Sequence, residues 1–271
     1  MTKLPFFLCI GAQKAGTTWL HHMLRQHPDL FLPETKELSF FDHKRNFEDR
    51  GLSWYESNFT AAGNDQRIGE VTPGYLWVWS SSSPDGKNSL SYRKGVPQRV
   101  LSVLGNNVKI IVLLRDPVDR GISAYLHHIR KGRIGLDQSI LSADRRHGIL
   151  EMGCYSKQLE IWRGYFHRSN FWIGYYEDVL FSPSKWLKDI FTFLGVDARY
   201  EVRSKSEAFN RHFEYRRRGD DIYLTSAPDL IESPVKVVSG AEIEELKKLY
   251  EEDVIRLESI TGASAPWSRF H

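Results

Sequence analysis

Phe6-Phe7-Leu8-Cys9-Ile10 is an uninterrupted apolar run, and Gly11-Ala12-Gln13-Lys14-Ala15-Gly16-Thr17-Thr18-Trp19 follows it directly. Such a run is typical of a strand that is buried on both faces of a parallel sheet. After the second glycine, Leu20, Met23 and Leu24 recur at helical spacing. The stretch therefore predicts a buried strand, a glycine turn and the N-terminus of a helix.

A turn of this kind is suited to binding an anion. Its amides converge on one point, the helix dipole adds positive potential, and Lys14 supplies a full charge. Gly11 and Gly16 have the spacing of the nucleotide-triphosphatase P-loop, but Lys14 lies inside the loop instead of after the second glycine. We predict a site for a nucleotide that carries phosphate or sulfate. The alternative is a glycine-rich turn with a solvated lysine.

The composition is that of a soluble globular protein. Of 271 residues, 41% are hydrophobic and 26% are charged, and the net charge of +3 is too mild for a general nucleic-acid binder. Two cysteines make no disulfide framework, so we expect a reducing compartment, the cytoplasm. No apolar segment approaches the length of a membrane span, and the N-terminal run leads into no signal-peptide cleavage site.

Strand and helix patterns alternate along the chain. Strands are predicted at 67–71, 108–114 and 171–176, with a short extended piece at 30–32, and helices at 51–59, 96–104, 117–130, 155–167, 183–194 and 240–260. This order predicts an α/β fold, in which helices cover both faces of a central parallel sheet. Residues 80–95, rich in serine, are predicted to form a flexible surface loop, and residues 201–223 a charged, irregular segment.

The second chemical motif follows the strand at 108–114. Arg115 leaves that strand, and Asp116 and Pro117 suit the N-cap and first position of the next helix. Ligands bind at the carboxyl ends of parallel strands, where Arg115 would offer a fork of donors to a second phosphate and Ser123 a hydroxyl. A structural ion pair of Arg115 with Asp116 or Asp119 is the alternative.

Together these motifs resemble the paired nucleotide motifs of the PAPS-dependent sulfotransferases, in their carbohydrate-type and bacterial branch. The resemblance rests on residues 5–19 and 111–125, on Lys36-Glu37-Leu38-Ser39-Phe40-Phe41-Asp42, on Gly69-Glu70-Val71-Thr72-Pro73, and on the ending at 249–267. It implies a single P-loop-like α/β domain over residues 1–271. It also implies transfer of a sulfuryl group from 3′-phosphoadenosine 5′-phosphosulfate (PAPS) without a metal.

The resemblance implies a role for each matching residue. The loop at 13–18 would hold the 5′-phosphosulfate, Lys14 would stabilise the leaving group, and Glu37 would be the general base, with Glu70 as second choice. The implied nucleotide-binding residues are Gln13, Lys14, Ala15, Gly16, Thr17, Thr18, Arg115, Ser123, Arg217, Arg218 and Gly219. An alternative interpretation of the basic run at 216–218 is a set of solvent-exposed charges that bind no ligand.

The base and the acceptor remain open at this stage. Besides the two glutamates, His43, His127 and His128 are candidates for the base. Ser39 and Val71 depart from the heparan-type pattern. An aromatic group hints at a ring-bearing or apolar acceptor, although core packing explains it equally well: Trp54, Tyr75, Trp77 and Trp79. A small molecule, a glycan or a lipid is compatible with these residues, and neither the choice between O- and N-sulfation nor the oligomeric state is predicted.

Two other functions compete with this one. A P-loop kinase would transfer phosphate from ATP with magnesium, but the displaced Lys14 and the arginine at 115, where a metal-holding aspartate would be wanted, argue against it. A non-catalytic nucleotide-binding module would keep both cations and need no base.

Overall fold

The computed structural model describes all residues except 1–2, 80–88, 144–146, 204–213 and 227–232. The chain divides into two compact units, one made of Met1–Arg115 with Lys157–Glu207 and the other of Asp116–Ser156 with Ala208–His271. The assignment of residues 1–271 to one domain stays a prediction.

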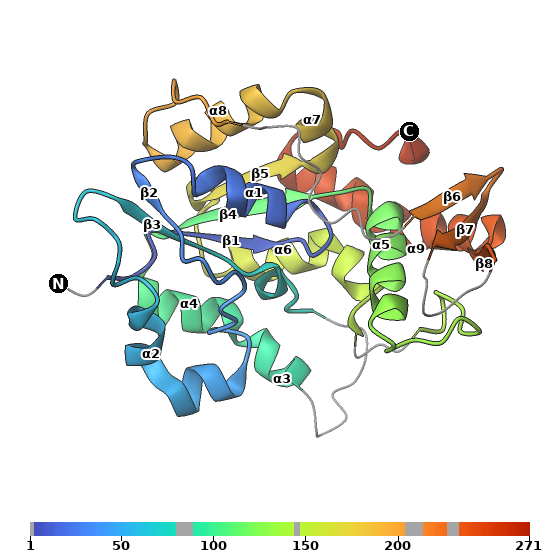
Figure 1. The fold of residues 1–271 in the computed structure, drawn as a ribbon, viewed down its shortest axis with the longest axis horizontal. Coiled ribbons are helices and arrows are strands. Elements are labelled where there is room, and N and C mark those ends of the chain that lie inside the picture. The colour runs from blue at the N-terminus through green and yellow to red at the C-terminus, as the bar shows by residue number, and fades with distance from the viewer. Residues whose placement is uncertain (1–2, 80–88, 144–146, 204–213, 227–232) are drawn as a thin grey trace. The chain divides into compact units, whose positions relative to one another are not determined.

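A five-stranded parallel sheet forms the centre of the first unit (Figure 1). Its strands are β1 (Phe7–Gly11), β2 (Leu30–Phe31), β3 (Arg67–Val71), β4 (Lys109–Leu114) and β5 (Phe171–Tyr175), in the order β2-β3-β1-β4-β5. The structure thus confirms the predicted α/β fold with a central parallel sheet. Because all neighbours are parallel, the carboxyl ends of the strands lie along one edge.

The apolar runs form the middle of this sheet. All five residues of β1 are buried, and all residues of β4 except Lys109. In the register of β1 with β3, Phe7 lies opposite Gly69, and a Cβ added to Gly69 would lie 2.0 Å from the Phe7 ring. The glycine in β3 therefore makes room for a buried aromatic ring.

Helices cover both faces of the sheet, as Figure 1 shows. On one face lie α1 (Thr17–Leu24) and α8 (Pro183–Leu194), joined by an edge-to-face contact of Trp19 with Trp186. On the other lie α4 (Val96–Leu104) and most of α6 (Tyr155–Arg163), where the Trp162 ring donates to the carbonyl of Tyr75. The first unit also contains α2 (Gly51–Ser57), α3 (Ser89–Lys94) and α7 (Tyr176–Phe181).

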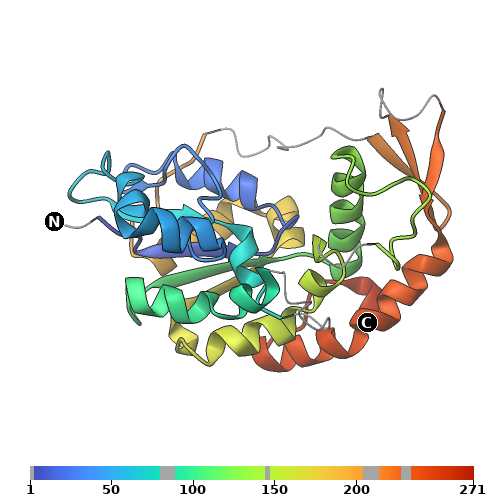
Figure 2. The same cartoon turned by 90° about the horizontal axis from the view of Figure 1, so that it is seen from below.

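The second unit combines helices α5 (Pro117–Arg130) and α9 (Gly240–Thr261) with an antiparallel sheet of β6 (Glu214–Arg218), β7 (Asp221–Ser226) and β8 (Val235–Val238). Figure 2 shows this sheet beside the start of α9. Asp116 caps α5 by accepting from the amides of Val118 and Asp119, as its position before a proline predicts. Ser239 caps α9 in a capping box with Glu242.

Two sequence predictions were wrong in part. Residues 80–88 of the predicted loop at 80–95 lie outside the described residues, but 89–94 form α3. The segment at 201–223 is not irregular throughout, because residues 214–226 contain β6 and β7. Among the residues that the structure describes, no helix is long and apolar enough to cross a membrane.

Candidate functional site

The turn between β1 and α1 has the geometry of an anion-binding loop. The amide of Ala12 donates to the carbonyl of Leu113 at 2.5 Å, which ties the loop to β4, and that of Ala15 donates to Ala12 at 3.2 Å. Gly16 precedes α1 with φ 88°, a conformation that favours glycine. The amides that open a helix have no acceptor within it, so those of Thr17 and Thr18 can donate only to a group outside the helix.

Arg115 lies against this loop. Its Nη1 donates to the carbonyl of Lys14 at 3.2 Å, and its guanidinium lies 5.0 Å from the centre of the Tyr176 ring. A Cβ added to Gly16 would lie 2.9 Å from the same ring. Three elements therefore meet here: the end of β4, the loop after β1 and the residue that follows β5.

The segment at 36–42 lies beside the end of β3. The amide of Glu37 donates to the carbonyl of Val71 at 3.1 Å, and the Glu37 side chain is 53% exposed and pairs with Lys36 at 2.5 Å. Both Glu37 (φ 64°) and Ser39 (φ 50°) have left-handed backbone, which is uncommon outside glycine. The geometry leaves the Glu37 carboxylate accessible to a substrate.

Glu70 has the opposite environment. Its side chain is 1% exposed, and its oxygens accept from the hydroxyls of Thr72 and Tyr75, both at 2.7 Å, and from the hydroxyl of Tyr55. Burial raises the pKa of Glu70 to about 7, although the three hydroxyl bonds oppose the rise. The carboxylate is thus enclosed by protein donors.

Sequence reasoning missed two groups at the same edge. Lys36 has a side chain only 15% exposed, and its charge acts on buried His21 of α1, whose pKa burial lowers to about 4. Tyr176 contacts both the loop and Arg115. A usable signal existed for Tyr176, because it is the last residue of the strand predicted at 171–176, at the carboxyl end where ligands bind.

Most of the aromatic group is structural. Tyr75 is fully buried, Trp77 is 5% exposed with Arg93 over its ring, and Trp79 lies under Lys157. These contacts favour core packing over an acceptor surface.

The histidine candidates have unlike surroundings. His43 is exposed, whereas His128 belongs to the second unit, where it is buried and stacks on His147 at 4.3 Å. His127 precedes it on α5.

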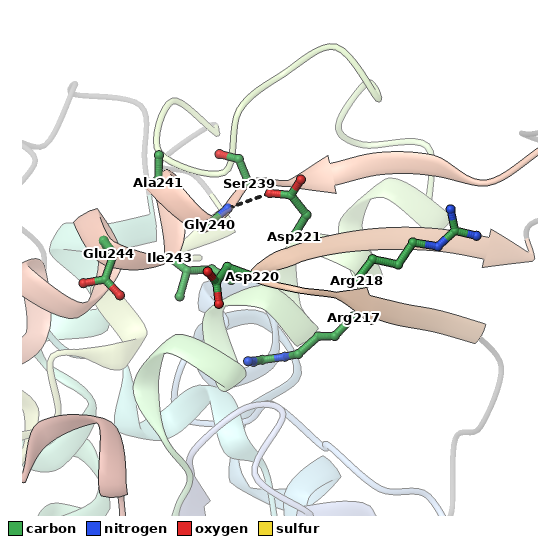
Figure 3. Close-up of a pocket in the computed structure, with 9 residues that line it drawn as sticks. All are labelled: Arg217, Arg218, Asp220, Asp221, Ser239, Gly240, Ala241, Ile243 and Glu244. Atoms are coloured by element: carbon green, nitrogen blue, oxygen red, sulfur yellow. Dashed lines mark hydrogen bonds between the residues drawn. The ribbon is translucent and has the colours of Figure 1, made fainter.

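The remaining candidates belong to the second unit. Ser123 lies on α5, and Arg217, Arg218 and Gly219 lie on β6 and in its turn to β7. Their part in a nucleotide site stays a prediction. Figure 3 shows Arg217 and Arg218 extending in different directions from their strand, around a pocket that also contains three carboxylates, Asp220, Asp221 and Glu244.

Carboxylates in this unit already pair with arginines. Arg217 contacts Asp119 at 3.1 Å, and Arg269 contacts Asp116 at 2.7 Å and Asp119 at 2.9 Å. A phosphate that bound Arg217 would therefore compete with Asp119.

Comparison with known proteins adds independent information. A family model described as the sulfotransferase domain matches residues 5–217. The chain is similar to the membrane-associated sulfotransferase kil1 of Dictyostelium discoideum, with 34% identity over 125 residues, 45% of this chain and 22% of that protein. It is also similar to human heparan sulfate glucosamine 3-O-sulfotransferase 3B1, with 30% identity over 202 residues, 72% of this chain and 47% of that protein.

The chain thus spans half or less of the length of these two relatives. Among solved structures, a sulfotransferase from Alicyclobacillus acidocaldarius superposes with a TM-score of 0.70 and 24% identity, over 97% of this chain and 98% of that one. This likeness shows the fold.

Proposed function

Since the chain belongs to the sulfotransferase family, we propose that it transfers the sulfuryl group of PAPS to an acceptor hydroxyl or amine. The observation that carries the proposal is the contact of Arg115 with the carbonyl of Lys14. That contact joins the end of β4 to the loop after β1 at the carboxyl edge of one parallel sheet, which supports binding of a ligand with two anionic groups there.

The loop at 13–18 fits the phosphosulfate end of such a donor. Gly16 lets the loop turn tightly in front of α1, and the first helical amides and Lys14 supply donors and positive charge. In the proposed reaction, Lys14 stabilises the negative charge that develops on the bridging oxygen. A single donor of this kind typically contributes ~3–4 kcal/mol to transition-state stabilisation.

Arg115 fits the other anionic group, the 3′-phosphate. Its guanidinium is held by the Lys14 carbonyl and the Tyr176 ring, so its fork of donors is restricted in orientation. We assign Ser123 and the residues Arg217, Arg218 and Gly219 to the same phosphate. For these four the support is the family resemblance.

Glu37 is the proposed general base. Its carboxylate is exposed at the sheet edge, whereas that of Glu70 is enclosed by three hydroxyls. Glu37 accepts the proton of the acceptor as the acceptor oxygen bonds to sulfur, and the bond from sulfur to the bridging oxygen breaks. Lys36, which pairs with Glu37, orients its carboxylate.

The experiment begins with binding. Isothermal titration with adenosine 3′,5′-bisphosphate is compared with titration with ATP–Mg, for the wild type and for Arg115→Ala. We expect the wild type to bind the bisphosphate more tightly than ATP–Mg, and Arg115→Ala to bind the bisphosphate more weakly than the wild type does. Preference for ATP–Mg would favour a kinase.

Turnover is then measured by mass spectrometry, as products that gain a sulfuryl group when PAPS is added to cell extract with the protein. Lys14→Ala and Glu37→Gln should reduce the product to a small residual rate, and Glu37→Gln should leave bisphosphate affinity intact. Binding without any sulfated product over a broad panel of acceptors would indicate a nucleotide-binding module.

A further inference from the structure

Glu70 does more than fill a buried position. With or without a proton on Oε2, the Oε1 atom of Glu70 accepts hydrogen bonds, and each hydroxyl has one hydrogen. The hydroxyls of Thr72 and Tyr75 both direct that hydrogen to Oε1 of Glu70, each at 2.7 Å. Their lone pairs therefore remain for other donors.

Those lone pairs accept from the backbone of the segment that carries Glu37. The amide of Phe40 donates to the Tyr75 hydroxyl at 2.9 Å, the amide of Phe41 to the same oxygen at 3.4 Å, and the amide of Ser39 to the Thr72 hydroxyl at 3.4 Å. Two chains of hydrogen bonds thus connect Glu70 to the backbone at 39–41.

The third hydroxyl acts on the same segment by packing. Tyr55 donates to Oε2 of Glu70, and its ring stacks on Phe40 with centroids 4.2 Å apart and planes 7° from parallel. Both oxygens of Glu70 therefore fix groups that contact residues 39–41.

This backbone needs such support, because it is not relaxed. Glu37 and Ser39 lie at positive φ on either side of buried Leu38. Non-glycine residues keep this conformation only where surrounding contacts enforce it. The Asn46 side-chain amide also supports the segment, because it donates to the carbonyls of Leu38 and Ser39, both at 3.0 Å.

We infer that Glu70 is a positioning residue: through the hydroxyls of Thr72 and Tyr75 it holds the backbone at 39–41 and thereby places the Glu37 carboxylate for proton transfer. The catalytic half of this inference rests on the proposed function, in which Glu37 is the base. The structural half, in which Glu70 holds the backbone at 39–41, is independent of the proposed function. A substitution at Glu70 should therefore slow turnover without weakening nucleotide binding.

The structural half is tested by residue-resolved amide hydrogen exchange. In Tyr75→Phe, which removes the acceptor, the amide of Phe40 should exchange at least about tenfold faster than in the wild type, the effect of losing one hydrogen bond. In Glu70→Gln, which keeps the Tyr75 hydroxyl but loosens its support, the same amide should exchange faster by a smaller factor. Tyr250→Phe is the matched control. It removes the hydroxyl of a buried tyrosine that donates to the Leu150 carbonyl, and it should leave exchange at 39–41 unchanged.

The catalytic half is tested by a double-mutant cycle with PAPS and an acceptor identified in the product screen. Glu70→Gln should lower kcat about tenfold while KM for PAPS and the affinity for adenosine 3′,5′-bisphosphate stay within about twofold. In a protein that already carries Glu37→Gln, adding Glu70→Gln should lower kcat no further, since the carboxylate that Glu70 positions is absent.

The outcomes separate the two proposals. Unchanged exchange at Phe40 in both variants would overturn the positioning role and leave the proposed function standing. Independent, additive losses of kcat would show that Glu70 does not act through Glu37, and would also overturn the positioning role. A fully active Glu37→Gln enzyme would remove the proposed base, and with it the catalytic half of the inference.

Discussion

Replacing Glu70 by glutamine should change how the stability of the protein depends on pH. Burial raises the pKa of this carboxyl from 4.5 to about 7 in the folded protein, against the hydrogen bonds from Tyr55, Thr72 and Tyr75, and with a further rise from nearby Asp42. Between these two pH values the folded protein holds a proton that the unfolded chain has lost. The stability that Glu70 contributes is thus fully present below pH 4.5 and is lost as the pH rises to about 7.

The size of the effect follows from the two pKa values. Each unit of difference corresponds to 1.36 kcal/mol, so a rise from 4.5 to about 7 gives roughly 3 kcal/mol. Because the side chain is only 1% exposed, this figure needs no large discount for solvent screening. Glutamine carries no charge at any pH and should show no such loss.

The assay is urea unfolding of wild type and Glu70→Gln from pH 4.5 to pH 8, followed by the fluorescence of the tryptophans. The free energy of unfolding of the wild type should fall relative to that of the variant by about 3 kcal/mol over this range, with equal m-values. Other groups titrate in both proteins and cancel in the difference. If the two curves run parallel, Glu70 is ionised in the fold throughout, and the reasoning fails.

Three further predictions concern packing, binding and capping. Gly69→Ala should lower the free energy of unfolding by about 1–3 kcal/mol because the new methyl group meets the Phe7 ring. Gly63→Ala is the control, since the nearest atom to its new methyl group lies at an ordinary 3.4 Å. Urea unfolding of both variants checks this. Arg115→Lys should weaken adenosine 3′,5′-bisphosphate about tenfold by titration, since lysine loses the fork of donors. Ser239→Ala should cost about 1 kcal/mol in urea unfolding, by removing the cap of α9.

Each of these has a contradicting outcome. Equal unfolding curves for Gly69→Ala and Gly63→Ala would show that the Phe7 ring moves aside without cost. Unchanged bisphosphate affinity in Arg115→Lys would mean that a single positive charge suffices there. An unaltered midpoint in Ser239→Ala would place the cap of α9 elsewhere.

Local pattern was enough for most of the elements. The structure confirms the strand at 67–71 and the helices at 96–104, 117–130 and 183–194 with the predicted bounds, because apolar periodicity, proline at the first helical turn and glycine at the end are all short-range signals. The hairpin of β6 and β7 was missed. Its strand at 214–218 is mostly charged and exposed, so pairing with β7 stabilises it, and that pairing is invisible in the local pattern.

The sequence by itself determined the parallel sheet, the glycine loop with Lys14, and the placement of Arg115 at a strand end, since each depends on neighbours along the chain. The tertiary structure alone decided that Arg115 donates to the Lys14 carbonyl, that Tyr176 lies against both, and that Glu70 is enclosed while Glu37 is exposed. The physical reason is that burial and hydrogen-bond partners come from segments far apart in sequence. The two glutamates that the sequence offers as candidates for the base therefore acquire their different accessibilities and hydrogen-bond partners only when the chain folds.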